Sequence, residues 1–337
     1  MAIGSGIISG IADICIDLKL QGPALIVTGP TTSEIIGKEI SRLLAKSGFE
    51  SDVFLSYASR LDEVDRAERL ARENEMNLII AAGGGRSIDI AKLTSIRLDI
   101  PFVSVPTAAS HDGICSAQAS LTLNGEATSI SARTPLAIVA DTKIISQAPP
   151  RLLAAGCGDI ISNYTAILDW QLAKRLRNEE YSEYAAALSS MTARMIVELA
   201  TTIRPGLEES AKIVVKALIS SGVAMSIAGS SRPASGSEHK FAHAMNRIAP
   251  RKALHGELCG LGTIIMMYLH GGDWRMIKEA LFQLGAPTSA AQLDIEPETL
   301  VEALAKANEI RPERYTILDS GLTKRAAAKA AEVTGII

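Results

Sequence analysis

Residues with the chemistry of metal ligands occur in three separated segments of the chain. The segments are Gly158-Asp159, Glu238-His239-Lys240-Phe241-Ala242-His243 and Leu254-His255-Gly256-Glu257. His239 and His243 are four residues apart, so they would share one face of a helix. One carboxylate and two imidazoles would give three protein ligands and leave one coordination position open, as a catalytic metal requires. Taken singly, each histidine is better explained as a packed or surface residue, so the prediction of a metal site depends on their combination.

A second segment predicts a site for a phosphate group. The apolar run Asn77-Leu78-Ile79-Ile80-Ala81-Ala82 is typical of a buried strand, and Gly83-Gly84-Gly85-Arg86-Ser87-Ile88-Asp89 follows it directly. Glycines that lead into a helix leave backbone amides free to bind a phosphate or pyrophosphate. Neither this run nor the earlier turn Gly29-Pro30-Thr31-Thr32-Ser33 matches the dinucleotide fingerprint Gly-x-Gly-x-x-Gly. Alone, a triple glycine is often only a tight turn between a strand and a helix.

The composition is compatible with a large globular enzyme and argues against several other classes. The 337 residues suffice for two domains, 47% of them are hydrophobic, and the net charge of −3 argues against a general nucleic-acid binder. The four cysteines form no Cys-x-x-Cys pair, and we expect Cys157 and Cys259 to pack beside the site without binding the metal. The N-terminus lacks the basic segment of a signal peptide, and the longest apolar stretch, Leu261 to Leu269, is too short to span a bilayer. We therefore expect a soluble, cytoplasmic protein without membrane insertion.

The first part of the chain alternates strand-like and helix-like patterns. Strands are predicted over 24–27, 52–55, 78–82, 102–105 and 136–141, helices over 33–46, 61–75 and 88–93, and a hairpin over 116–122 and 127–131 around Asn124-Gly125. Strands that alternate with helices indicate a parallel sheet with right-handed crossovers. The charge-dense stretch 61–69 is expected to be a solvated helix face.

After Pro149-Pro150 the pattern becomes helical. Helices are predicted over 160–176, with Asp159 at their start, and over 184–201, 211–227, 241–248, 257–269 and 297–308. The fold prediction is an α/β dinucleotide-binding domain over 1–150, with a Rossmann-like parallel sheet, and an all-α domain over 151–337 that holds metal and substrate. The active site is expected in the cleft between the two domains.

The segment from Val105 to Gly113 follows a predicted strand, where parallel sheets bind ligands. Thr107 and Ser110 could bind a cofactor, and Asp112 could bind a substrate hydroxyl. Ordinary turn chemistry would explain the same residues. His111 is not expected to be a ligand, because the other histidines already account for a metal.

In their order along the chain these segments resemble the superfamily of glycerol dehydrogenase, the iron-activated alcohol dehydrogenases and dehydroquinate synthase. Thr107-Ala108-Ala109-Ser110-His111-Asp112-Gly113 and the block from Glu238 to His243 are most similar to the glycerol-1-phosphate dehydrogenases. The resemblance implies a dehydroquinate synthase-like fold. It also implies NAD(P)H-linked reduction of dihydroxyacetone phosphate to sn-glycerol-1-phosphate, which supplies the backbone of archaeal ether lipids.

The resemblance also implies roles for individual residues. It places one zinc ion per subunit on Asp159, His239 and His255, and it places Asp112, Asp159 and His243 at the substrate as catalytic residues. It assigns NAD or NADP to Gly83, Gly84, Gly85, Arg86, Ser87, Asp89, Thr107, Ala108, Ser110 and Ser116. Asn163 stands where iron-activated alcohol dehydrogenases have a fourth ligand, a histidine, and Asp159 stands where dehydroquinate synthase has a glutamate. Both differences favour a polyol or polyol-phosphate dehydrogenase with three metal ligands, although the same ligands would also suit Fe(II).

Several alternatives remain open at this stage. The chain could be a glycerol dehydrogenase acting on unphosphorylated glycerol, a dehydroquinate synthase-like cyclase, or a cofactor-binding regulatory protein with a vestigial site. The complete set of metal ligands argues against the last. A homo-oligomer with a small-molecule substrate and no nucleic-acid partner is expected.

Two further hypotheses concern the substrate and the cofactor. A substrate phosphate needs a cation, and five basic residues lie near the histidines in sequence, most of them expected to form a solvated rim: Arg232, Lys240, Arg247, Arg251 and Lys252. The second predicted strand is followed by Ser56-Tyr57-Ala58-Ser59-Arg60, which contains no carboxylate to repel a 2′-phosphate. NADPH is therefore expected to bind as well as NADH.

Overall fold

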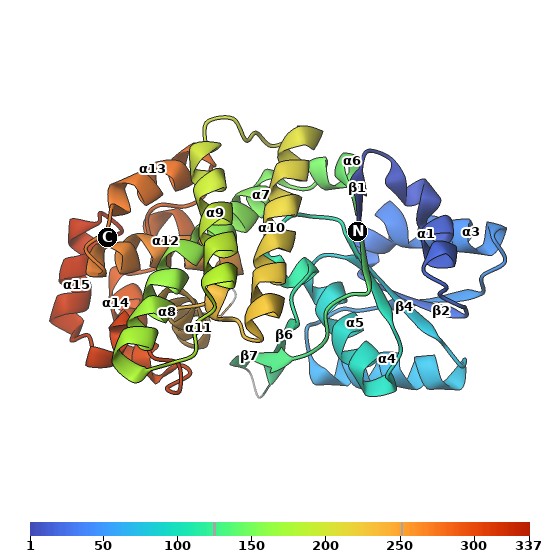
Figure 1. Cartoon of the computed structure of the whole chain (residues 1–337), viewed down its shortest axis with the longest axis horizontal. Helices are drawn as coiled ribbons and strands as arrows, with labels where there is room; N and C mark the ends of the chain where they lie inside the picture. The colour runs from blue at the N-terminus through green and yellow to red at the C-terminus, as the bar shows by residue number, and fades with distance from the viewer. Residues whose placement is uncertain (124–125, 251) are drawn as a thin grey trace. The chain divides into compact units, whose positions relative to one another are not determined.

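The computed structural model describes residues 1–123, 126–250 and 252–337 (Figure 1). Contacts divide the chain into two compact units. Unit 1 comprises Met1–Ala109, Gly113–Pro149 and Pro205–Val215, and unit 2 comprises Ser110–Asp112, Pro150–Arg204 and Lys216–Ile337. The division is therefore not a single cut near residue 150. Residues 110–112 belong to unit 2 although they precede it, and residues 205–215 belong to unit 1 although they follow it.

Unit 1 contains a six-stranded sheet in the order β1-β8-β5-β4-β2-β3, and every neighbouring pair is parallel. The strands are β1 (Ala2–Gly4), β2 (Ala24–Thr28), β3 (Ser51–Leu55), β4 (Leu78–Gly83), β5 (Phe102–Pro106) and β8 (Ala137–Asp141). The prediction of a parallel α/β sheet is confirmed, and only the short edge strand β1 was not predicted.

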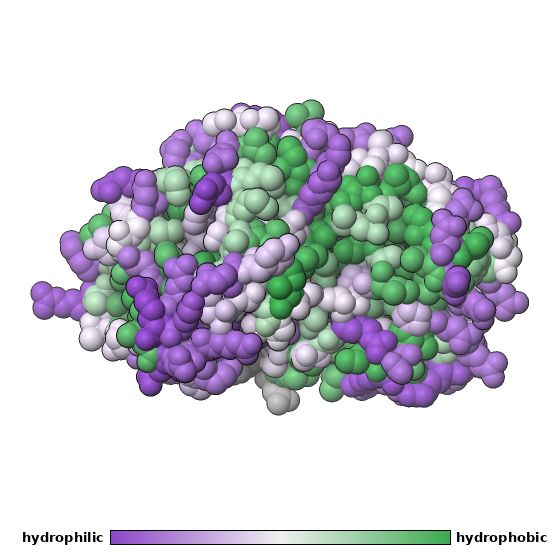
Figure 2. All heavy atoms as spheres, viewed as in Figure 1, coloured by the Kyte–Doolittle hydropathy of each residue, from purple (hydrophilic) through white to green (hydrophobic). Residues whose placement is uncertain are grey.

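Helices cover both faces of this sheet. Ile26, Ile80 and Val103 pack in one cluster with Ile40 and Leu44 of α3 (Lys38–Lys46), while the neighbouring strand residues, which point the other way, are equally buried. On the other face α5 (Gly85–Leu98) packs on β4 and β5, and α4 (Leu61–Glu73) packs on α5. Figure 2 shows hydrophilic residues where α4 meets solvent, as predicted for 61–69.

The remaining elements of unit 1 are short. They are η1 (Ile7–Gly10), α1 (Ile11–Asp17), α2 (Pro30–Thr32), η2 (Ser33–Gly37), α6 (Thr142–Ser146) and the antiparallel hairpin of β6 (Gln118–Leu123) and β7 (Glu126–Ser131). The hairpin is confirmed, and the predicted Asn124-Gly125 turn lies outside the described residues.

Unit 2 is helical, with no strand among its described residues. Its helices are α7 (Pro150–Ile161), α8 (Asn163–Arg177), α9 (Glu183–Glu198), α11 (Ser237–Ile248), α12 (His255–Leu269), α13 (Trp274–Gln283), α14 (Pro297–Lys306) and α15 (Lys324–Val333), with short 3-10 turns η4 (Arg232–Ala234), η5 (Ala291–Leu293), η6 (Ala307–Glu309) and η7 (Ile317–Ser320). η3 (Asp112–Ile114) and α10 (Glu208–Ala228) each run across the division between the units. The helices α7, α13 and α15 were not predicted.

Among the described residues, α10 alone is long and apolar enough to cross a membrane. Its most apolar window is 56% buried within the protein, which is typical of a core helix. The apolar stretch Leu261 to Leu269 is shorter than α10, which was not expected to be a membrane-span candidate.

The position predicted for Asp159 is wrong, because it lies in the last turn of α7 and not at the start of a helix. The run Gly156-Cys157-Gly158 resembles a turn in sequence, but α12 crosses α7 there. A Cβ on Gly158 would lie 2.4 Å from the carbonyl oxygen of Gly256, and one on Gly256 would lie 1.9 Å from that of Ala155. The glycines therefore allow two backbones to touch, which places Asp159 beside the start of α12.

Candidate functional site

The four donor atoms of Asp159, His239, His255 and Cys259 lie within 4.8 Å of one another in unit 2. Oδ1 of Asp159 is 3.8 Å from Nε2 of His239 and 3.8 Å from Nε2 of His255. Ligands bound about 2.0–2.3 Å from a common centre at tetrahedral angles are separated by about 3.3–3.8 Å. The spacing therefore fits a divalent metal between these side chains, and the three predicted ligands are brought together from α7, α11 and α12.

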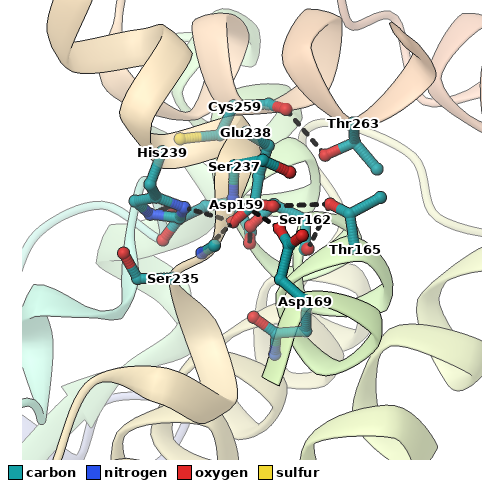
Figure 3. Close-up of polar contacts among 12 residues, drawn as sticks. Asp159, Ser162, Thr165, Asp169, Ser235, Ser237, Glu238, His239, Cys259 and Thr263 are labelled. Carbon is teal, nitrogen blue, oxygen red and sulfur yellow. Dashed lines mark hydrogen bonds and ion pairs between the residues drawn. The ribbon is translucent and has the colours of Figure 1, made fainter. Parts of the chain in front are cut away.

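A buried carboxylate orients His239 (Figure 3). Oε1 of Glu238 is 2.9 Å from Nδ1 of His239 and accepts a hydrogen bond from the amide of Gly236 at 2.6 Å. Oε2 of Glu238 accepts a hydrogen bond from Oγ1 of Thr165 at 2.6 Å. With Nδ1 held by a carboxylate, Nε2 is left free to bind a metal ion, an arrangement common around histidine ligands. No role for Glu238 was predicted from the sequence, although its place next to His239 is a signal that could have identified it.

Asp159 divides its two oxygens between different partners. While Oδ1 faces the imidazoles, Oδ2 accepts a hydrogen bond from the backbone amide of Asp112 at 2.9 Å. The carboxylate of Asp112 in turn accepts a hydrogen bond from Oγ of Ser221 at 3.1 Å. The predicted substrate residue Asp112 thus lies next to the predicted metal ligand.

Cys259 belongs to this group of donors. Its Sγ is 3.5 Å from Nε2 of His255, one helical turn away on α12. Burial raises the pKa of the Cys259 thiol well above its usual value, so the expectation that Cys259 packs beside the site without binding the metal stays a prediction. Cys157 is fully buried and absent from the donor group.

An ion pair between Arg151 and Glu257 holds the start of α12. Arg151 donates two hydrogen bonds to the carboxylate of Glu257, at 2.5 and 2.7 Å, and Glu257 also accepts one from the amide of Leu254 at 2.8 Å. These bonds link α7 to the first turn of α12 and thereby position His255.

Burial controls the charge of the cluster. It raises the pKa of Asp159 to about 7, with a further contribution from the nearby charge of Glu238, and it raises the pKa of Glu238 to about 7. Burial also lowers the pKa of His239 and His243 well below its usual value and lowers that of His255. The imidazoles are therefore neutral near pH 7 and ready to bind a cation, and a cation would in turn favour ionised carboxylates.

His243 lies beside the cluster without belonging to its donors. Its ring centroid is 5.9 Å from that of His255, and the side chain is half-buried. His243 is therefore near the donor group without being one of its members.

The residues predicted to bind the cofactor separate into two groups. In unit 1, Gly83 and the turn after β2 meet at the point where strand order reverses between β2 and β4, which is where open α/β sheets bind ligands. The amide of Thr107 donates to the carbonyl of Gly83 at 3.0 Å, so the ends of β4 and β5 are joined there. A Cβ on Gly84 would meet nothing within 4 Å, which leaves open space above the first turn of α5.

The other predicted cofactor residues differ in accessibility. Arg86 is exposed and Gly85 is half-exposed, while Ser87, Thr107, Ala108 and Ser116 are buried. Asp89 is also buried, and its Oδ1 lies 3.7 Å from Nζ of Lys92. Ser110 belongs to unit 2 and is not grouped with the glycine turn.

Comparison with known proteins identifies relatives over the whole chain. Residues 2–149 match the family described as iron-containing alcohol dehydrogenase. The glycerol-1-phosphate dehydrogenase (NAD(P)+) of Methanothrix thermoacetophila is 65% identical over 334 residues, which is 99% of this chain and 94% of the relative. That of Pyrococcus furiosus is 53% identical over 336 residues, covering 99% and 97%.

Solved structures share the fold. A probable glycerol dehydrogenase from Sinorhizobium meliloti superimposes with a TM-score of 0.81 at 20% identity, over 99% of this chain and 95% of that one. The predicted fold class is confirmed by this likeness. From the identity to its relatives over nearly its entire length, the chain belongs to the glycerol-1-phosphate dehydrogenase (NAD(P)+) family of oxidoreductases.

Proposed function

We propose that this protein reduces dihydroxyacetone phosphate to sn-glycerol-1-phosphate with NADH or NADPH, in a reaction that requires one zinc ion per subunit. The convergence of Asp159, His239 and His255 on one point carries the proposal. The names of the relatives support the substrate and the cofactor. The product would supply the backbone of archaeal-type membrane lipids, and we expect the enzyme to be a cytoplasmic homo-oligomer.

Bound zinc would polarise the substrate ketone as a Lewis acid, and the reduced nicotinamide would supply the hydride. Overall, ketone, hydride and one proton give the secondary alcohol. Asp159, His239 and His255 would hold the ion, and Glu238 would keep His239 in the tautomer whose Nε2 is free. The amides at the start of α5 would bind the cofactor's pyrophosphate.

The new alcohol oxygen needs the proton, and His243 is the side chain best placed to deliver it. Burial lowers the pKa of His243 well below its usual value, so the neutral ring has one protonated and one unprotonated nitrogen near pH 7. Such a ring can donate a proton from one nitrogen and accept one from water at the other. Asp112, fixed by Ser221, would accept a hydrogen bond from a substrate hydroxyl.

The proposal is tested by following NADH oxidation with dihydroxyacetone phosphate and, separately, with dihydroxyacetone. We expect turnover of the phosphorylated ketone to be far more efficient. The product should resist oxidation by a dehydrogenase specific for sn-glycerol-3-phosphate. Equal efficiency with dihydroxyacetone would instead indicate a glycerol dehydrogenase, and an absence of NADH oxidation with either ketone would favour a cyclase.

A further inference from the structure

The basic residues near the histidines in sequence are largely committed to other partners. Nε of Arg232 donates to Glu179 at 2.6 Å, and Nη1 donates to the carbonyl of Tyr315 at 2.8 Å. Nζ of buried Lys240 donates to Asp319 at 3.1 Å. Lys252 is exposed and donates to a backbone carbonyl, Arg247 is exposed at the end of α11, and Arg251 lies outside the described residues. Arg232 and Lys240 therefore act as structural cations, which removes the two most buried candidates for binding a substrate anion.

The loop after η6 brings two other arginines to the same region of unit 2. Because η6 packs on α11, this loop begins beside the helix that carries His239 and His243. Arg314 fixes the loop, since its guanidinium donates to the carbonyl of Ser235 at 2.5 Å and to Oγ of Ser231 at 2.7 Å. Both acceptors lie just before the start of α11.

Arg311 differs from Arg232, Lys240, Lys252 and Arg314, whose hydrogen bonds are described above. It is half-buried, yet among the described residues its guanidinium makes no hydrogen bond or ion pair. Its backbone has a φ of 48°, in the left-handed region that side chains other than glycine rarely adopt. Strained backbone of this kind persists where surrounding structure enforces it, and it is frequent at ligand sites.

The charge of Arg311 acts on the metal cluster. Arg311 follows η6, which packs on α11, and its positive charge acts on the rings of His239, His243 and His255. Burial lowers the pKa of Arg311 itself, and among its neighbours Glu313 acts in the opposite direction. A partly desolvated guanidinium without a hydrogen-bonded acid is unfavourable unless an anion binds there.

We infer that Arg311 binds the phosphate of the substrate, with Arg314 as the residue that positions its loop. The inference rests on the proposed function, because it assigns a residue to the phosphate of that substrate. A guanidinium can bind two phosphate oxygens through parallel N–H donors, which gives both affinity and orientation. The ketone would then be held at one end by the metal cluster and at the other by Arg311.

The test compares Arg311→Met and Arg311→Lys with the unchanged protein, using both dihydroxyacetone phosphate and dihydroxyacetone. Loss of a charge-assisted bidentate contact should raise KM for the phosphorylated ketone by about 100-fold. Efficiency with dihydroxyacetone should stay within about 3-fold, because that substrate has no phosphate to lose. Arg311→Lys should be intermediate, since it keeps the charge but not the paired donors. Arg325→Met removes an exposed arginine of the same unit that makes no hydrogen bond or ion pair in the described structure, and it should change neither substrate.

Inorganic phosphate gives a second readout that is independent of turnover. It should bind the unchanged protein and bind Arg311→Met at least about tenfold more weakly. An equal loss of efficiency with both ketones, or unchanged phosphate binding, would overturn the assignment. If the unchanged protein reduced no dihydroxyacetone phosphate, the proposed function would fail. Weaker phosphate binding to Arg311→Met would still support an anion site at Arg311.

Discussion

The group of donor side chains in unit 2 (Asp159, His239, His255 and Cys259) and the glycine turn of unit 1 (Gly83–Gly85) are built on opposite physical principles. The cluster consists of side chains from three helices, and burial shifts the pKa of Asp159, His239 and His255. The turn provides backbone amides with no side chains, and the space above Gly84 is open. The difference teaches that a candidate metal site is recognised by donor side chains that converge on one point. A candidate phosphate site of this kind is recognised by a turn whose backbone amides are not covered by side chains.

Removing one metal ligand should have the largest effect. We expect His239→Ala or His255→Ala to reduce turnover about a thousandfold or more and to abolish stoichiometric zinc binding. A site with three ligands loses much of its zinc affinity when one of them is removed. Cofactor binding, measured by NADH fluorescence titration, should persist because the glycine turn belongs to unit 1. His270→Asn is the matched control, since His270 pairs with Asp169 and lies outside the donor group. Near-normal turnover with full zinc content in either alanine variant would show that the metal site is misassigned.

Removing the charge behind His239 should have a smaller effect. Glu238→Gln keeps the shape of the side chain but weakens the acceptor at Nδ1, so zinc affinity should fall about 10–100-fold. The measurement is competition with a chelating indicator of known affinity. Thr165→Val, which removes one hydrogen bond to the same carboxylate, should weaken affinity less. Unchanged affinity in Glu238→Gln would mean that Glu238 serves only folding.

The pH dependence of zinc binding should report on Asp159. Its pKa near 7 means that the metal-free carboxyl is protonated below that pH, while burial lowers the pKa of His255 and lowers that of His239 well below its usual value. Zinc binding below pH 7 must therefore release the proton of Asp159. As the pH falls below 7, the dissociation constant for zinc should rise about tenfold per pH unit for each proton released. It should be nearly flat above pH 7.

Calorimetry in two buffers of different ionisation enthalpy counts these protons. At pH 6 we expect one proton from Asp159, and a second if Glu238 also ionises. No release at pH 6, or release of three or more protons, would contradict the assigned protonation states.

The glycine turn offers a pair of variants that separate binding from folding. Gly84→Ala places a methyl group in open space, so it should cost about 1 kcal/mol of stability or less while weakening NADH binding about tenfold or more. Gly83→Ala should lower the melting temperature as well, because its Cβ would lie 2.8 Å from Oγ of Ser87. Unchanged NADH affinity in Gly84→Ala would place the cofactor elsewhere.

The smallest effect concerns the choice between NADH and NADPH. No carboxylate follows β3 before Asp62, and that residue pairs with Arg60. Asp52 instead accepts a hydrogen bond from Asn74. We expect the two cofactors to differ by less than about a hundredfold in kcat/KM. A thousandfold preference for NADH, about 4 kcal/mol, would mean that an acidic residue guards the ribose.

The centre of the sheet could be predicted well because β2, β4 and β5 are mostly apolar runs that are buried on both faces. Asp159 was misplaced because Gly156 and Gly158 indicate a turn unless the crossing of α12 is known. The residues of the proposed metal site could be named from residue types and order, since few side chains serve as metal ligands, and the structure brings their donor atoms together. The role inferred for Arg311 could not be predicted from the sequence. The hydrogen bonds of Arg232, Lys240 and Arg314 are visible only in the structure.

The most direct test of the account is reconstitution of metal-free protein with zinc while NADH oxidation by dihydroxyacetone phosphate is followed. The account predicts no turnover without metal and a rate that rises linearly until one zinc ion is bound per chain. A rate that is the same before and after zinc is added, in protein shown to be free of metal, would contradict it.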